Sequence, residues 1–159
     1  MDIALSKSAQ SIQDFLSQKN LTTKVIELPA STRTAVEAAA ALQCDVAQIV
    51  KSLLFRTNET NKPILVLVSG VNRVNEKSIE NKLGLKIIKA DADFTKDITG
   101  FAIGGIPPVG HKQIIDTFID EDLLLFDELW AAAGTPNAVF CLNSNDLCII
   151  TGGKLISIK

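Results

Sequence analysis

The sequence is poor in the residues that build metal centres and disulfides. It has one histidine, His111, and its three cysteines, Cys44, Cys141 and Cys148, form neither a Cys-x-x-Cys pair nor a zinc-ligand spacing. Transition-metal sites rely on imidazole and thiolate ligands, so a metal site would need carboxylates alone. We therefore expect no metal and no cofactor. We expect the cysteines to be buried, reduced thiols, because free cysteine is commonly buried.

The sequence also lacks a long apolar run. The longest, "PILVLVSGV", is interrupted at Gly70 and is shorter than the roughly 18 residues that cross a bilayer. The opening "MDIALSKSAQ" has no basic region followed by an apolar one, so a secretory signal is not expected. We expect a cytoplasmic location and no membrane partner.

Neither sign of charge dominates the chain. Its net charge of −2 at pH 7 offers no broad attraction to nucleic acid. The charges are nevertheless unevenly distributed, with ten basic and six acidic residues between Lys51 and Lys112, and six acidic and no basic residues between Asp116 and Glu128. Such a distribution could steer an anionic ligand to one face, although solvated faces without a partner give the same pattern.

Apolar residues are abundant, at 47% of the 159 residues, and this is the composition of an ordinary folded domain. Periodicity and capping signals predict helices at residues 5–20, 34–43, 71–85 and 91–100, with a helical turn at 45–48 and a turn or short helix at 143–148. Apolar β-rich runs predict strands at residues 22–28, 49–57, 62–70, 86–90, 137–142 and 154–158. This irregular mixture predicts a single α/β (mixed α+β) domain over residues 1–159, with a mixed sheet flanked by helices.

Two of the helices carry clear end signals. Thr34 and Glu37 have capping-box spacing at the start of one. Asn75 is the expected N-cap of another, and Gly84 its C-terminal stop.

A glycine- and proline-rich segment, "GFAIGGIPPVGHK" at residues 100–112, cannot form a regular helix or a central strand. It is a poor phosphate-binding loop, because His111 displaces the lysine by one position and Pro107 and Pro108 have no N–H group. "GFAIGG" is not a dinucleotide fingerprint. No Gly-x-Ser-x-Gly elbow accompanies His111, and a Cys–His pair remains open.

The remaining chemistry for this segment is a site built from main chain. Glycines let a ligand approach the backbone, whose N–H groups can donate to a carbonyl oxygen or a sugar. Prolines stiffen the loop, so such donors would be held in advance of binding. The alternative is a rigid turn with no ligand.

The sequence context of Lys51 favours a ligand site over a rigid turn. Strand alternation places it on one face with Ile49 and Leu53. A lysine on an apolar face is costly to desolvate unless it meets an anion or a polarised oxygen. The alternative is an edge lysine whose ammonium extends into water.

The pattern resembles the YbaK/ProX-like aminoacyl-tRNA deacylases, relatives of the editing domain inserted in bacterial prolyl-tRNA synthetase. The resemblance runs from about Thr34 to Lys159 and rests on "TAVEAAAALQCDVAQIVKSLLF", "GGIPPVGHK" and "FDELWAAAGTPNAVF". It implies a single domain with a mixed, barrel-like sheet. It also implies hydrolysis of the ester that joins a wrong amino acid to the terminal ribose of transfer RNA.

The resemblance implies the site residues as well. It implies catalytic roles for Lys51, which would hold the polar end of the substrate or stabilise developing charge, and for Gly105. The implied substrate-binding residues lie in two loops and are Gly104, Ile106, Pro107, Pro108, Gly110, His111, Gly134, Thr135 and Pro136. Some family members have serine or threonine before the loop proline, where this chain has Pro107-Pro108, so their amino acid preference does not carry over.

Ester hydrolysis needs a positioned water and a stabilised oxyanion, and it requires neither a metal nor a covalent triad. We expect a small amino acid as substrate, such as alanine, serine, threonine or cysteine, because a pocket rejects larger side chains sterically. The expected partners are mischarged transfer RNA and a synthetase such as prolyl-tRNA synthetase. The alternatives are a non-catalytic module that binds aminoacyl-tRNA ends or aminoacyl-adenosine-like ligands, and an esterase for another small ester.

Overall fold

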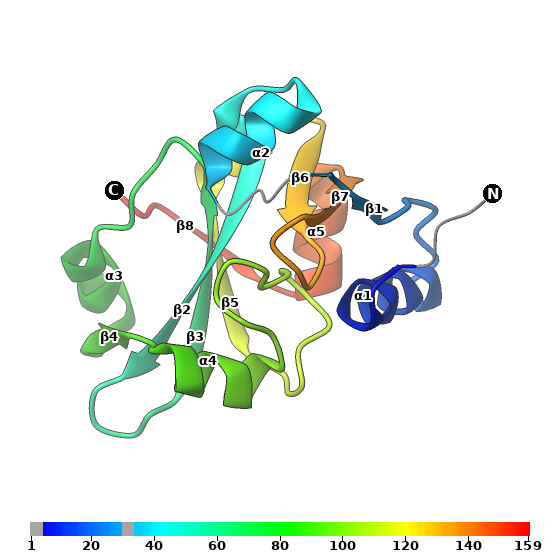
Figure 1. Cartoon of the computed structure of the whole chain (residues 1–159). Coiled ribbons are helices and arrows are strands. Elements are labelled where there is room, and N and C mark those ends of the chain that lie inside the picture. Colours follow the sequence, from blue (N-terminus) through cyan, green and yellow to red (C-terminus); the bar gives the residue numbers. More distant parts are fainter. Residues whose placement is uncertain (1–4, 30–33) are drawn as a thin grey trace.

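In the computed structural model, which describes residues 5–29 and 34–159, the strands join into one mixed sheet (Figure 1). Its strands are β1 (Ile26–Glu27), β2 (Ile49–Thr57), β3 (Pro63–Ser69), β4 (Ile87–Lys89), β5 (Asp116–Asp120), β6 (Leu129–Ala132), β7 (Ala138–Leu142) and β8 (Lys154–Ile156). Seven of them are ordered β1-β7-β6-β2-β3-β5-β8. The eighth strand, β4, stands outside this order and pairs with β2. The predicted fold class, a mixed α/β sheet with flanking helices, is confirmed.

The helices lie around this sheet, with α1 and α3 at opposite sides of it in Figure 1. They are α1 (Lys7–Gln18), α2 (Ala35–Leu42), α3 (Glu76–Leu83), α4 (Ala92–Thr99) and α5 (Ser144–Thr151), with short 3-10 helices η1 (Val46–Gln48) and η2 (Glu121–Leu125). The predicted caps are confirmed: Thr34 accepts a hydrogen bond from the Glu37 N–H, and Asn75 from the Ser78 N–H. Among the helices of the described ranges, none has the length and apolar character needed to span a bilayer.

The core lies on both sides of β3. This strand runs between β2 and β5, and residues 65–68 have no solvent exposure. Leu65 and Leu67 pack in one apolar cluster, whereas Val66 and Val68 pack in another on the opposite face. Successive side chains of a strand point to opposite faces, so an uninterrupted apolar run is what a strand buried on both sides requires.

One edge of β2 has no partner strand along its middle residues, and the candidate functional site lies at this gap. β3 pairs along β2 from Val50 to Arg56, but on the other edge β6 pairs only at Ile49 and Val50, and β4 begins at Phe55. Main-chain groups of a strand alternate between its two edges. The Leu54 carbonyl accepts from Ala90 on the β4 side, so Ser52 presents its main-chain groups to the gap between β6 and β4.

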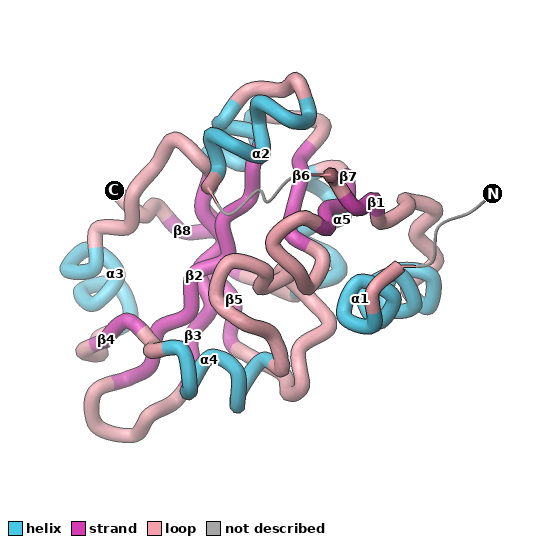
Figure 2. Tube along the Cα trace, in the orientation of Figure 1, coloured by secondary structure: helices cyan, strands magenta, loops and turns pink. Residues whose placement is uncertain are grey.

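Two parts of the prediction differ from the structure. The strand expected over residues 22–28 has only two residues, Ile26 and Glu27, paired with β7. Residues 114–130, for which the pattern predicted no element, form β5, η2 and the start of β6. The acidic residues at both ends of β5 hide its strand pattern. The long loop between α4 and β5 has no regular structure, as expected, and Figure 2 shows it in the middle of the molecule.

Candidate functional site

A cavity of about 470 Å³ opens at the uncovered edge of β2. Its walls come from four segments of the chain: residues 49–53 of β2, the start of α2, residues 70–73 after β3, and Ile103, Gly104 and Ile106 of the glycine-rich loop. The end of β6 and Pro136 close the remaining side. Three of its lining residues are half- to two-thirds-exposed apolar side chains: Val36, Val71 and Ile103. The volume lies within the range of small-molecule sites, roughly 300–1,000 Å³.

Lys51 lines this cavity, and its ammonium is held in place. Nζ donates a hydrogen bond of 2.6 Å to the main-chain carbonyl of Asn72. Burial lowers the pKa of Lys51, the nearby Arg73 guanidinium lowers it further, and the Asp120 carboxylate acts in the opposite direction. An ammonium has three donors, and the residues that the structure describes engage one of them, which leaves two N–H groups for a ligand. The polar oxygen that Lys51 meets in the structure is thus the Asn72 carbonyl of the protein itself.

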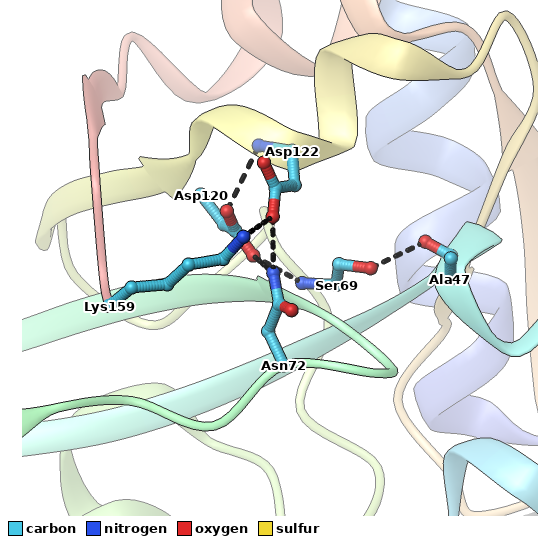
Figure 3. Close-up of polar contacts among 6 residues, drawn as sticks. All are labelled: Ala47, Ser69, Asn72, Asp120, Asp122 and Lys159. Atoms are coloured by element: carbon cyan, nitrogen blue, oxygen red, sulfur yellow. Dashed lines mark hydrogen bonds and ion pairs between the residues drawn. The ribbon is translucent and has the colours of Figure 1, made fainter.

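The turn that supplies this carbonyl, residues 69–72, is fixed by a buried carboxylate (Figure 3). Asp120 is 1% exposed. Its Oδ2 accepts from the Ser69 N–H at 3.0 Å and from Asn72 Nδ2 at 2.8 Å. Its Oδ1 accepts from the Asp122 N–H at 3.0 Å. The carboxylate thus joins the end of β5 to the 69–72 turn.

The glycine-rich loop meets the cavity through two of its predicted residues, Gly104 and Ile106. Neither N–H group has a hydrogen-bond partner among the described residues. Gly104 has φ +98°, a left-handed conformation that favours glycine. These two main-chain N–H groups are therefore available as donors to a ligand.

Gly105 has a different environment from the one expected for a catalytic residue. Its N–H donates to the Ala102 carbonyl at 3.1 Å, and its own carbonyl accepts from the Gly134 N–H at 3.0 Å. A Cβ at this position would lie 2.8 Å from Thr135 Cα. Gly105 therefore lets the glycine-rich loop pack against residues 134–136, and its N–H group is already engaged. Gly134 and Thr135 likewise serve this contact, whereas Pro136 lines the cavity.

The other predicted loop residues lie behind the cavity wall. Pro107 and Pro108 are buried, and Gly110 approaches Ile12 of α1. His111 Nε2 forms a hydrogen bond of 2.6 Å with the Pro107 carbonyl. Burial lowers the pKa of His111, and the hydrogen bond to Pro107 opposes this effect. In the structure, His111 therefore closes the glycine-rich loop on itself through the Pro107 carbonyl.

Sequence reasoning missed four polar residues of the site. Asn72 and Arg73 line the cavity, and Asp120 supports it. Ser52 also lines it, and its Oγ is buried without a hydrogen-bond partner among the described residues. In the sequence, Ser52 stands next to Lys51 and Asn72 follows a buried strand. Neither feature is specific enough to predict a site residue.

The histidine, cysteine and acidic side chains of the described ranges are dispersed. No three His, Cys, Asp or Glu side chains of these ranges gather as ligands. The three cysteines are free and half-buried, and burial raises the pKa of each thiol. None of the three lines the cavity or contacts His111 in the described part of the chain.

Comparison with known proteins agrees with this geometry. Residues 29–148 match the family described as the aminoacyl-tRNA editing domain. The match covers most of the chain, so the chain belongs to the aminoacyl-tRNA editing domain family. The predicted resemblance is thereby confirmed.

Individual relatives point in the same direction. The solved structure of a proposed trans-editing enzyme for prolyl-tRNA synthetase superimposes with a TM-score of 0.93 at 43% identity, and covers 98% of this chain and 99% of that one. The uncharacterized protein YwhH of Bacillus subtilis (strain 168) is 27% identical over 93% of this chain and 94% of its own length. The proline–tRNA ligase of Brachyspira hyodysenteriae is 36% identical over 75 residues, 46% of this chain and only 13% of the ligase.

Proposed function

We propose that the protein is a free-standing deacylase that hydrolyses the ester of transfer RNA mischarged with a small amino acid. The observation that carries this proposal is the convergence of the Lys51 ammonium and the glycine-rich loop on one cavity. Membership of the editing-domain family supports the class of reaction. The similarity to a proposed trans-editing enzyme supports action on a transfer RNA charged by another protein.

In the proposed reaction, a water molecule attacks the carbonyl carbon of the aminoacyl ester, and negative charge develops on the carbonyl oxygen. The two remaining N–H groups of Lys51 and the N–H groups of Gly104 and Ile106 stabilise that charge. The bond between the carbonyl carbon and the ribose oxygen then breaks, and a proton originating from water ends on the ribose hydroxyl. The neighbouring hydroxyl of the same ribose orients the water, so the protein need not supply a histidine base.

Cavity size would set the choice of amino acid. The walls combine small side chains, such as Ala131 and Ala132, with the β2 edge. Such walls exclude large side chains sterically but separate near-isosteres by only about 1–3 kcal/mol. The substrates we propose are alanine, serine, threonine and cysteine esters.

The exposed apolar side chains that line the cavity suit the planar base of a terminal nucleoside. Val36, Val71 and Ile103 would contact the base, and Arg73 would face the backbone phosphate. With a net charge of −2 the chain gains little from general electrostatic attraction. We therefore propose weak, salt-sensitive binding of transfer RNA, assisted by a synthetase such as prolyl-tRNA synthetase.

The test is a panel of mischarged transfer RNAs incubated with substoichiometric protein. Release of amino acid over many turnovers is expected for the wild type. Lys51→Ala should lower the rate by roughly 100- to 1,000-fold, as expected for loss of one oxyanion donor. Lys62→Ala is the matched control, because Lys62 is an exposed lysine paired with Asp116 and lies outside the cavity.

Three results would contradict the proposal. Protection of the ester without release would indicate a binding module. Hydrolysis of simple esters alone would indicate a different esterase. Wild-type activity in Lys51→Ala, with the folded state intact by circular dichroism, would remove Lys51 from the mechanism.

A further inference from the structure

Asp120 carries a buried carboxylate that lies outside the cavity. It is 1% exposed and does not line the cavity. Burying a carboxylate is costly unless hydrogen bonds compensate, and Asp120 accepts three of them, from Ser69, Asn72 and Asp122. Two of these donors belong to the 69–72 turn, so the carboxylate acts chiefly on that turn.

The 69–72 turn is also held from its other side. The Gly70 N–H donates to the Ile49 carbonyl at 2.8 Å, and Ser69 Oγ donates to the Ala47 carbonyl at 2.7 Å. A Cβ on Gly70 would lie only 2.2 Å from the Val46 carbonyl oxygen. The turn is therefore confined between η1 and the end of β5. The orientation of the Asn72 carbonyl, which accepts from Lys51, follows from this confinement.

From these contacts we propose that Asp120 and the Asn72 side chain are positioning residues, which fix the Asn72 carbonyl and thereby aim the Lys51 ammonium into the cavity. The order of contacts is Asp120 carboxylate, Asn72 carboxamide, Asn72 main-chain carbonyl and Lys51 Nζ (2.8 Å from Asp120 Oδ2 to Asn72 Nδ2, and 2.6 Å from the carbonyl to Nζ). The inference rests on the proposed role of Lys51 in deacylation.

The series of polar contacts continues from Asn72 to the protein surface. Asn72 Nδ2 also lies 2.8 Å from Asp122 Oδ2, and Asp122 forms an ion pair of 2.8 Å with Lys159 (Figure 3). Side-chain hydrogen bonds from Lys159 and Asn72 lower the pKa of Asp122. The Asn72 carboxamide therefore lies between two carboxylates from the β5–η2 junction, and both of its N–H bonds are used.

The first experiment is a double-mutant cycle on deacylation. Asn72→Ala removes the carboxamide but keeps the main-chain carbonyl, so Lys51 retains its acceptor while the acceptor loses its support. We expect kcat to fall roughly 10- to 100-fold, the loss typical of a misplaced catalytic group, with a smaller change in KM. In a Lys51→Ala background, Asn72→Ala should cause no further loss, because the two act as one unit.

The second experiment does not depend on deacylation. The pH dependence of Lys51 labelling by an amine-reactive reagent, followed by mass spectrometry, reports the pKa of its ammonium. Arg73 and Asp120 are the charged groups that shift this pKa within the described ranges. Asp120→Asn removes the anion, so labelling should begin at lower pH. The matched control, Asp116→Asn, changes the exposed aspartate at the other end of β5 and should leave labelling unchanged.

The outcomes separate this inference from the proposed function. If wild-type protein deacylates but Asn72→Ala keeps its kcat, or if the effects of the two substitutions multiply, the positioning role is refuted while the deacylase proposal stands. If the wild type deacylates nothing, the proposed function fails, and labelling still tests the contacts. Unchanged labelling in Asp120→Asn also refutes the inference. If Asp120→Asn does not fold, the double-mutant cycle with Asn72→Ala still decides the inference, because Asn72→Ala leaves the buried carboxylate in place.

Discussion

Replacing Gly105 by alanine tests whether the contact between two loops builds the cavity. The added Cβ would lie 2.8 Å from Thr135 Cα and 2.9 Å from Thr135 N and C. All three are main-chain atoms, so no side chain can rotate away. The φ of Gly105 lies outside the left-handed region, so alanine meets no backbone strain there and the effect is purely steric.

The size of the effect follows from contact distances. Carbon atoms pack comfortably at about 3.5–4.0 Å, so the loops must separate by roughly 0.7 Å or more. Overpacking of this kind costs about 1–3 kcal/mol, which lowers Tm by roughly 2–12 °C in a chain of this length. The same shift displaces Gly104 and Ile106 from Lys51. A misplacement approaching 1 Å lowers kcat by roughly 10- to 100-fold.

The assay compares Gly105→Ala with Gly84→Ala, each by thermal melting and by deacylation well below its Tm. Gly84 ends α3 with φ +69°, and a Cβ there would meet no atom within 4 Å. Alanine at this position should therefore cost about 1–2 kcal/mol of backbone strain and leave deacylation unchanged. The pair thus separates a loss of stability from a loss of cavity geometry.

Two results would refute this reasoning. One is a Gly105→Ala variant that melts and deacylates like the wild type, which would show that the two loops tolerate separation. Alternatively Gly84→Ala lowers kcat as much as Gly105→Ala does, in which case activity tracks stability alone. A fall in kcat with a preserved Tm would place the effect on the cavity and not on the fold.

Two further predictions concern His111 and Ser52. Because burial lowers the pKa of His111, this group contributes stability above its unfolded-state pKa of about 6.5, and the contribution is lost as the pH falls through the folded-state pKa. Tm should therefore drop more between about pH 7.5 and about pH 5 in the wild type than in His111→Gln, and equal drops would exclude a role for His111. Ser52→Ala removes a buried hydroxyl that has no hydrogen-bond partner within residues 5–29 and 34–159, so Tm should stay constant or rise. KM for mischarged transfer RNA should rise about 3- to 10-fold if the hydroxyl binds substrate. A lower Tm with unchanged KM would show that Ser52 is structural.

Local signals predicted most of the secondary structure. The caps at Thr34 and Asn75 depend only on residues three positions apart. β2 and β3 could be predicted because their apolar runs are long and strongly β-forming. β5 was missed because Asp116 and Asp120 interrupt its pattern. The first is paired with Lys62, and the second is buried by hydrogen bonds. Neither partner is visible from the strand's own sequence.

The sequence by itself determined the family, the N-caps of two helices and the two central strands, and it predicted that Lys51 and the glycine-rich loop belong to one site. Only the tertiary structure decided which loop residues reach the cavity. Gly104 and Ile106 line it, whereas Gly105 packs against Thr135 and His111 braces Pro107. It alone brought Asp120 to Asn72, 48 positions away. The physical reason is that capping and alternation act between near neighbours, while a cavity forms where distant strands separate.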